Sequence, residues 1–181
     1  MDTNILIHGC GTKVTEKNLI RNFCAEVDVC ISDTVYWEFL RNTAIDKFRS
    51  RRVDIAKWKD GDLLKEGSIL REDAKVAEMY ARLFIVLMKL NPKNPMRVLR
   101  LLKLNLWISA AAISYKYDHI LTTDLNDFPD ELFETVGQFS AGDWHMYLLV
   151  FKRKNIQKLW LDLFESPSII VQCDTFFQKK S

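Results

Sequence analysis

The sequence has few of the features that mark a secreted, membrane-spanning or zinc-binding protein. It contains only four cysteines, none of them in a C-x-x-C pair, and no cluster of histidine and cysteine resembles a zinc site. The apolar run at residues 83–88 is far too short to cross a bilayer. Only Met1 precedes Asp2, so we expect no basic and apolar secretion signal. These absences predict a soluble, reduced, cytoplasmic protein with no membrane partner.

The chain also lacks an excess of charge of one sign, internal repeats, low-complexity stretches and a linker. The chain has 26 Lys and Arg against 24 Asp and Glu, so its net charge of +2 does not indicate any class of binding partner. The 181 residues are 48% hydrophobic, which is enough for one globular core. We therefore expect a single domain over residues 1–181.

The order of the expected elements is typical of an α/β protein. Strands are expected at 27–31 and at Ile120–Leu121, and helices at 34–48, 68–89 and within 96–117. After residue 128 we expect strands at 134–139 and 144–151, the second with a helix as alternative, a helix from Asn155, and a short strand at 168–173. The β–α–β alternation predicts a three-layer α/β/α sandwich around a mostly parallel central sheet.

The stretch His119–Phe128 is the starting point for the predicted site, because a short apolar run ends there in Thr122, Thr123 and Asp124. The carboxyl ends of strands are where α/β sheets build their sites. A helix N-cap is the alternative interpretation of Asp124, since Thr and Asp after a strand often begin the next element.

Two further acids are expected near Asp124. Asp2 opens the chain, and Glu38 lies one turn into the helix after the second strand. Strand ends and helix starts on one edge of a sheet converge, and three carboxylates there repel one another unless a cation joins them. Mg²⁺ or Mn²⁺ prefers such oxygen ligands, and these ions activate water for attack on a phosphodiester. Taken singly, each acid is better explained as a cap or a surface charge.

Four segments in this order resemble the signature regions of the PIN-domain ribonucleases, and together they cover roughly residues 1–128. They are Asp2–Ile7, Glu38 in its helix, Leu106–Ala112 and Thr122–Phe128, which leaves 129–181 as a C-terminal extension. The resemblance implies a PIN-like fold and metal-dependent cleavage of RNA. Among short members it points to the VapC-type toxins of toxin–antitoxin pairs. By that likeness Asp2, Glu38 and Asp124 are metal ligands, Asn4 and Thr122 orient them, and Asp127 is a further acid.

Two departures from the family pattern bear on the site. The family places an acid where this chain has Asn105, and an amide oxygen binds a hard cation more weakly than a carboxylate. The family's first strand directly precedes its Asp-Thr-Asn triad, whereas here only Met1 precedes Asp2. Asp2 is then expected on a fraying terminus unless the chain begins upstream or obtains that strand in another way.

Contacts to nucleic acid must come from local charge. Arg97, Arg100 and Lys103 recur every three residues before Asn105, so a helix would place them near the expected site. A second basic group comprises Lys47, Arg49, Arg51 and Arg52. A solvated helix face explains either group equally well. Tyr36 and Trp37 are candidates to stack on bases, with a place in the core as the alternative.

The sequence thus predicts a metal-dependent endoribonuclease whose catalytic residues are Asp2, Glu38, Asn105 and Asp124. Its expected partners are RNA, a protein antitoxin or RNA-processing factor, and a second copy in a homodimer. The alternative is a nuclease-fold module that binds RNA or protein without efficient cleavage, which Asn105 favours. A phosphatase that uses Asp2 as nucleophile fits less well, because such enzymes need an acid where Asn4 stands.

Overall fold

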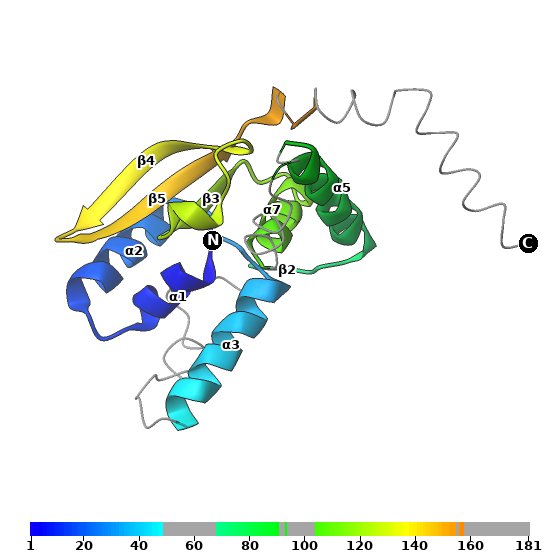
Figure 1. The fold of residues 1–181 in the computed structure, drawn as a ribbon. Coiled ribbons are helices and arrows are strands. Elements are labelled where there is room, and N and C mark those ends of the chain that lie inside the picture. The colour runs from blue at the N-terminus through cyan, green and yellow to red at the C-terminus, as the bar shows by residue number, and fades with distance from the viewer. Residues whose placement is uncertain (49–67, 91–92, 94–103, 155, 158–181) are drawn as a thin grey trace, which may run out of the picture.

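The computed structural model describes residues 1–48, 68–90, 93, 104–154 and 156–157 (Figure 1). Helices and strands alternate over the first part of the chain, and a strand hairpin follows. In chain order the elements are α1 (Thr3–Cys10), α2 (Val14–Glu26), β1 (Ile31–Ser32), α3 (Asp33–Phe48), β2 (Ile69–Leu70), α5 (Ala74–Leu90), α7 (Asn105–Ser114), β3 (His119–Thr122), the short 3₁₀ helix η1 (Leu125–Asp127), β4 (Phe133–Ala141) and β5 (Trp144–Phe151).

The expectation of one central, mostly parallel sheet is wrong. The described strands form two separate sheets, a parallel pair β1–β2 and an antiparallel sheet in the order β3–β5–β4. Strand β1 pairs with β2 over only two residues, Ile31 with Ile69 and Ser32 with Leu70. Strand β3 instead runs antiparallel to β5, with Ile120 opposite Leu149. The three-layer α/β/α sandwich is therefore replaced by a mixed α/β arrangement.

A tight hairpin is the physical reason for the second sheet. Strands β4 and β5 are joined at Gly142, whose φ of +64° lies in the left-handed region that glycine adopts without a steric penalty. A two-residue turn forces the strands it joins to run antiparallel, whereas parallel strands need a long crossover. The alternation of elements up to residue 122 could not show this, because the pairing partner of β3 lies beyond it.

Several individual elements lie where the sequence predicts them. Helix α3, strand β3, and the two strands of the hairpin match their expected positions. Helix α5 begins six residues later than expected, because Ile69 and Leu70 pair as a strand before it. Of the predicted helix from Asn155, only residues 156–157 are described, and they are helical. The predicted strand at 168–173 falls outside the described residues.

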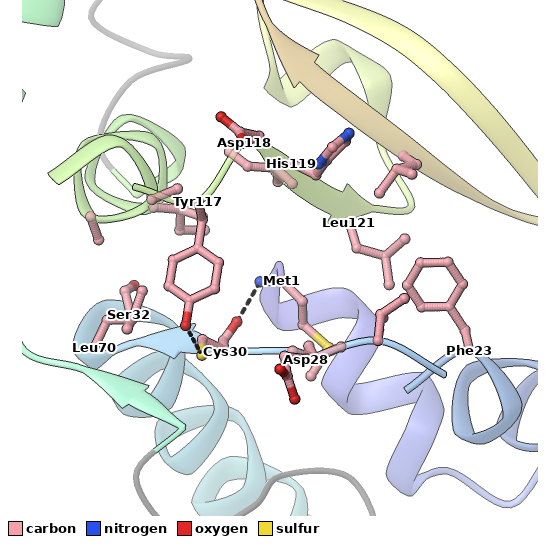
Figure 2. Close-up of a pocket in the computed structure, with 17 residues that line it drawn as sticks. Met1, Phe23, Asp28, Cys30, Ser32, Leu70, Tyr117, Asp118, His119 and Leu121 are labelled. Atoms are coloured by element: carbon pink, nitrogen blue, oxygen red, sulfur yellow. Dashed lines mark hydrogen bonds between the residues drawn. The ribbon is translucent and has the colours of Figure 1, made fainter. Parts of the chain in front are cut away.

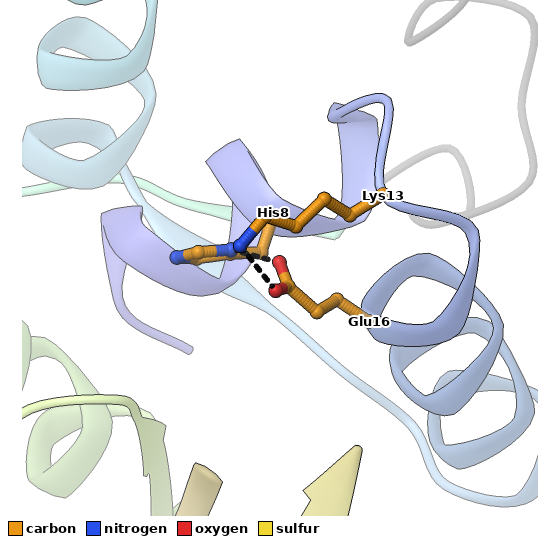
Figure 3. Close-up of polar contacts among 3 residues, drawn as sticks. All are labelled: His8, Lys13 and Glu16. Atoms are coloured by element: carbon orange, nitrogen blue, oxygen red, sulfur yellow. Dashed lines mark hydrogen bonds and ion pairs between the residues drawn. The ribbon is translucent and has the colours of Figure 1, made fainter. Parts of the chain in front are cut away.

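Helices α1 and α2 are joined by a buried ion-pair group (Figure 3). Glu16 on α2 is buried, and its carboxylate accepts from His8 Nδ1 at 2.5 Å and from Lys13 Nζ at 3.0 Å. Burial alone raises the pKa of the Glu16 carboxyl, but hydrogen bonds from Lys13 and His8 outweigh it and the pKa lies below 4.5. The charged carboxylate is therefore the form that holds α1 against α2.

One hydrophobic core connects the helices with both sheets. Its fully buried side chains come from nearly every described element, and they include Ile5, Ile20, Ile31, Phe39, Leu83, Leu106, Ile120 and Leu149. Tyr80 on α5 stacks on Trp107 of α7 with ring centroids 4.4 Å apart. This core holds the amino-terminal residues, the start of α3 and the end of β3 close to one another. Within the described part of the chain, no helix is both long and apolar enough to span a membrane.

Candidate acidic site

Asp2 lies between the start of α1 and the end of β3. Its backbone N–H donates to the Leu121 carbonyl at 2.9 Å, and its carboxylate Oδ2 accepts from the Thr122 hydroxyl at 2.8 Å. Both Asp2 and Thr122 are buried. Asp2 occupies the N-cap position of α1, yet its side chain makes no capping bond to that helix. The carboxylate is instead directed toward Thr122.

Glu38 joins the site from α3, one turn into the helix. The Thr3 hydroxyl donates to Glu38 Oε2 at 2.6 Å, which ties the first residue of α1 to α3. On its other side, Arg41 Nη2 lies 3.2 Å from Glu38 Oε1. The Arg41 side chain is 61% exposed, so this ion pair is solvated and contributes little to stability. It does place a cation at the solvent edge of the acidic group.

The third group of residues surrounds η1. Asp124 is the N-cap of this short helix and accepts from Asn126 N at 2.9 Å, so the cap interpretation of Asp124 is confirmed. A cap does not exclude a further role, because the charge of Asp124 also raises the pKa of the nearby Asp127 carboxyl. Asn105, the first residue of α7, hydrogen bonds to the carboxyl of Asp127.

Asp127 is the acid that connects these groups. Burial raises its pKa, the charges of Asp124 and Glu38 raise it further, and the hydrogen bond from Asn105 opposes them. Burial also raises the pKa of Asp2, hydrogen bonds from the Thr122 hydroxyl and the Thr3 backbone N–H lower it, and the charge of Asp127 raises it again. The four acids come from three segments, and Asp127 lies within range of the charges of the other three. We define Asp2, Glu38, Asp124 and Asp127 as the acidic cluster.

The carboxylate oxygens of the acidic cluster are ligands that a hard divalent cation prefers. Carboxylates that raise one another's pKa are stabilised when a cation lies between them. Among the described residues, however, no three His, Cys, Asp or Glu side chains lie close enough to enclose a metal ion. Mg²⁺ usually keeps several waters and takes only one or two protein carboxylates together with substrate phosphates. The cluster fits an ion of that kind, and it does not form a closed structural metal site.

The other predicted site residues lie as follows. Asn4 is exposed, and its neighbour Thr3 makes the hydrogen bond to Glu38. Arg97, Arg100 and Lys103, together with Arg49, Arg51 and Arg52, fall outside the described residues. Trp37 is 68% exposed on α3, next to Glu38. Sequence reasoning missed Thr3 and Arg41; the spacing of Arg41 three residues after Glu38 on one helix was the available signal.

Comparison with protein-family models, with characterised proteins and with solved structures found no match to this chain.

Proposed function

We propose that this chain is a metal-dependent endoribonuclease whose site is the acidic cluster. One observation carries the proposal: Asp2, Glu38 and the Asp124–Asp127 pair come from three separate segments, and Asp127 lies within range of the charges of the other three acids. Two of the four carboxylates, Asp2 and Asp127, are shielded enough from water that burial raises their pKa. Folding brings these charges together against their repulsion, which is a common property of catalytic sites.

The cation that suits this cluster is Mg²⁺ or Mn²⁺, bound by one or two of its carboxylates together with substrate phosphates. When bound, such an ion polarises the phosphodiester and lowers the pKa of the attacking water. Thr122 and Thr3 hold one oxygen of Asp2 and one of Glu38, which limits rotation of both carboxylates. Positioning groups of this kind keep ligands in the geometry that catalysis requires.

Helix α3 carries two side chains suited to RNA beside the cluster. The exposed indole of Trp37 offers a stacking surface for an unpaired base. Arg41 is mostly exposed and forms a solvated pair with Glu38, so its guanidinium is available to a phosphate oxygen. A single-stranded RNA is the substrate that uses both kinds of contact.

The second candidate function is RNA binding without efficient cleavage. Asn105 favours it, because its amide contributes a hydrogen bond to Asp127 where a carboxylate would contribute charge. Fewer charges bind a cation more weakly and activate water less. The two candidates share the same surface and differ only in turnover.

Cleavage of single-stranded RNA in Mn²⁺ tests the proposal. We expect cleavage to stop with chelator and to fall by roughly 10²–10³ in Asp124→Asn, as when an important electrostatic group is lost. Asp143→Asn, an exposed acid in the β4–β5 turn, is the control and should cleave like the unaltered chain. Undiminished cleavage by Asp124→Asn would place the activity elsewhere. RNA binding with no cleavage by the unaltered chain would favour the binding module.

A further inference from the structure

An open apolar cavity lies where α5, the end of α7 and the end of β5 meet (Figure 1), and none of its lining residues belongs to the acidic cluster. Its volume is about 230 Å³, and its apolar lining consists of Met79, Leu83, Ile113, Phe151 and Ile156. Leu83 and Phe151 are buried, whereas the other three are partly exposed. We call this cavity the α5 groove. Pockets that enclose a whole small molecule usually have volumes of ~300–1,000 Å³, so the α5 groove suits a few side chains of a larger partner.

Three cations from three segments line the α5 groove together with these apolar residues. Arg82 belongs to α5, Lys116 follows α7, and Arg153 follows β5, while no Asp or Glu is among the described lining residues. Arg82 pairs with Glu78, and Arg153 pairs with Asp118. Both of these acids are more than half exposed, so water screens the two pairs. Lys116 is exposed, and among the described residues its ammonium group has no acidic partner.

A larger cavity, of about 290 Å³, shows that this positive charge is not a property of every cavity in the described part of the chain (Figure 2). Its described lining contains two acids, Asp28 and Asp118, and no Lys or Arg. Figure 2 shows Asp28 on one side of this cavity and Asp118 on the other. The α5 groove therefore differs from it in the sign of its charge. An exposed apolar patch with a charged border is typical of a binding surface for a partner of opposite charge.

Lys116 occupies a backbone position that favours glycine. At the end of α7 its N–H donates to the Ile113 carbonyl at 3.1 Å, and the Tyr117 N–H donates to the Ala112 carbonyl at 2.8 Å. Helices that end in this way usually have glycine in place of Lys116, because the backbone there is left-handed and a Cβ is strained. The φ of Lys116 is +66°, and no other described residue except glycine has a positive φ. Strained residues of this kind are concentrated at functional sites, so the strain indicates a use for the Lys116 side chain.

From the charge, the apolar lining and the strained lysine we infer that the α5 groove binds an acidic amphipathic helix of a partner protein. Aliphatic side chains of that helix fill the groove, where the flexible Met79 adapts to their shape. Its carboxylates lie against Lys116, Arg82 and Arg153, whose separate segments suit acids spread along a helix. Single-stranded RNA fits less well, because its bases stack on exposed aromatic rings. Phe151 is the one aromatic side chain among the described lining residues, and it is buried.

Fluorescence anisotropy with a labelled helical peptide tests the inference on the full chain. The peptide has about 15 residues, with leucine at every third or fourth position and glutamate on the opposite face. We expect it to bind, and to bind roughly threefold or more weakly to Lys116→Gly, because one solvated ion pair is lost. The double variant Lys116→Gly with Arg153→Gln should lose roughly tenfold. Lys116→Arg should keep the affinity, and so should the control Lys17→Gln on α2, a helix that contributes no residue to the α5 groove.

Thermal unfolding of the same variants separates a binding role of Lys116 from a structural one. Glycine adopts the left-handed backbone of position 116 without strain. We therefore expect Lys116→Gly to melt at the same temperature as the unaltered chain or slightly above it. Weaker peptide binding by a variant that is at least as stable would show that the lysine side chain contributes to binding.

Equal affinity of the unaltered chain and Lys116→Gly for the peptide would overturn the inference. Equally tight binding of a peptide with lysine in place of glutamate would also overturn it, because the groove would then not select charge. If Lys116→Gly weakened the binding of single-stranded RNA and the glutamate peptide did not bind, the cations would serve nucleic acid and the inference would be wrong. The experiment needs neither metal nor cleavage, so its failure would leave the proposed function of the acidic cluster unaffected.

Discussion

At the scale of single residues, Asn105 decides how much charge the acidic cluster carries. Its amide hydrogen bonds to Asp127, so replacement by aspartate would set a fifth carboxylate beside an acid whose pKa is already raised. We predict that Asn105→Asp lowers the melting temperature in chelator, because like charges repel. With Mn²⁺ the order should reverse, since a carboxylate binds a hard cation better than an amide does.

Thermal unfolding in chelator and across a Mn²⁺ titration measures this prediction, and RNA cleavage follows in parallel. Asn18→Asp on the exposed side of α2 is the matched control and should respond to Mn²⁺ as the unaltered chain does. A Mn²⁺-dependent stabilisation that is the same in Asn105→Asp and Asn18→Asp would show that the cluster binds no cation through position 105.

At the scale of elements, the pair α1 and α2 depends on the ionised Glu16. The hydrogen bonds from Lys13 and His8 lower its folded pKa below 4.5, so the unfolded chain binds a proton more readily than the folded one. Its contribution to stability is therefore complete above about pH 4.5 and is lost as the pH falls through the lower folded value. We predict that Glu16→Gln costs about 1–3 kcal/mol at pH 7, the usual value for hydrogen bonds to a buried charge.

Denaturant unfolding of Glu16→Gln at a series of pH values from 7 to 3 measures the loss in free energy of unfolding and the direction in which that loss changes with pH. The difference from the unaltered chain should shrink as the pH falls below 4.5. Glu26→Gln, an exposed acid at the end of α2, is the control and should show little difference at any pH. If the loss in free energy of unfolding for Glu16→Gln instead grew toward acid pH, the folded pKa of Glu16 would not be lowered and the prediction would be wrong.

Helix α3 is the element that carries the side chains we propose as RNA contacts. Trp37 is exposed, so its removal leaves the core intact. We predict that Trp37→Ala weakens binding of single-stranded RNA by roughly 5- to 100-fold, since stacking of a base on an aromatic ring contributes ~1–3 kcal/mol. Fluorescence anisotropy with labelled RNA measures it. Tyr115→Ala, another exposed aromatic at the end of α7, should bind as tightly as the unaltered chain.

At the scale of the whole molecule, the hairpin and the helices unfold together if they share one core. Leu149 on β5 is buried opposite Ile120 of β3 and belongs to that core. We predict that Leu149→Ala lowers the free energy of unfolding by ~2–5 kcal/mol. Far-ultraviolet circular dichroism and tryptophan fluorescence should give the same midpoint.

The matched control for Leu149→Ala is Val136→Ala, which removes an exposed valine from β4 in the same sheet. Its effect should stay within about 0.5 kcal/mol. Two separate transitions in Leu149→Ala would contradict a shared core and would show that the antiparallel sheet unfolds by itself.

The sequence by itself determined several local elements and three acids of the cluster, although the strand expected at 27–31 is formed only at Ile31–Ser32. Apolar periodicity and turn residues act over a few positions, so α3, β3 and the hairpin strands could be predicted, and Asp2, Glu38 and Asp124 could be named as a group. Strand pairing joins residues that are far apart in the chain, and no local pattern encodes the partner. Only the tertiary structure could therefore show that β3 pairs with β5, that Asp127 lies near the other acids of the cluster, and that the Met1 amino group donates to the Cys30 carbonyl.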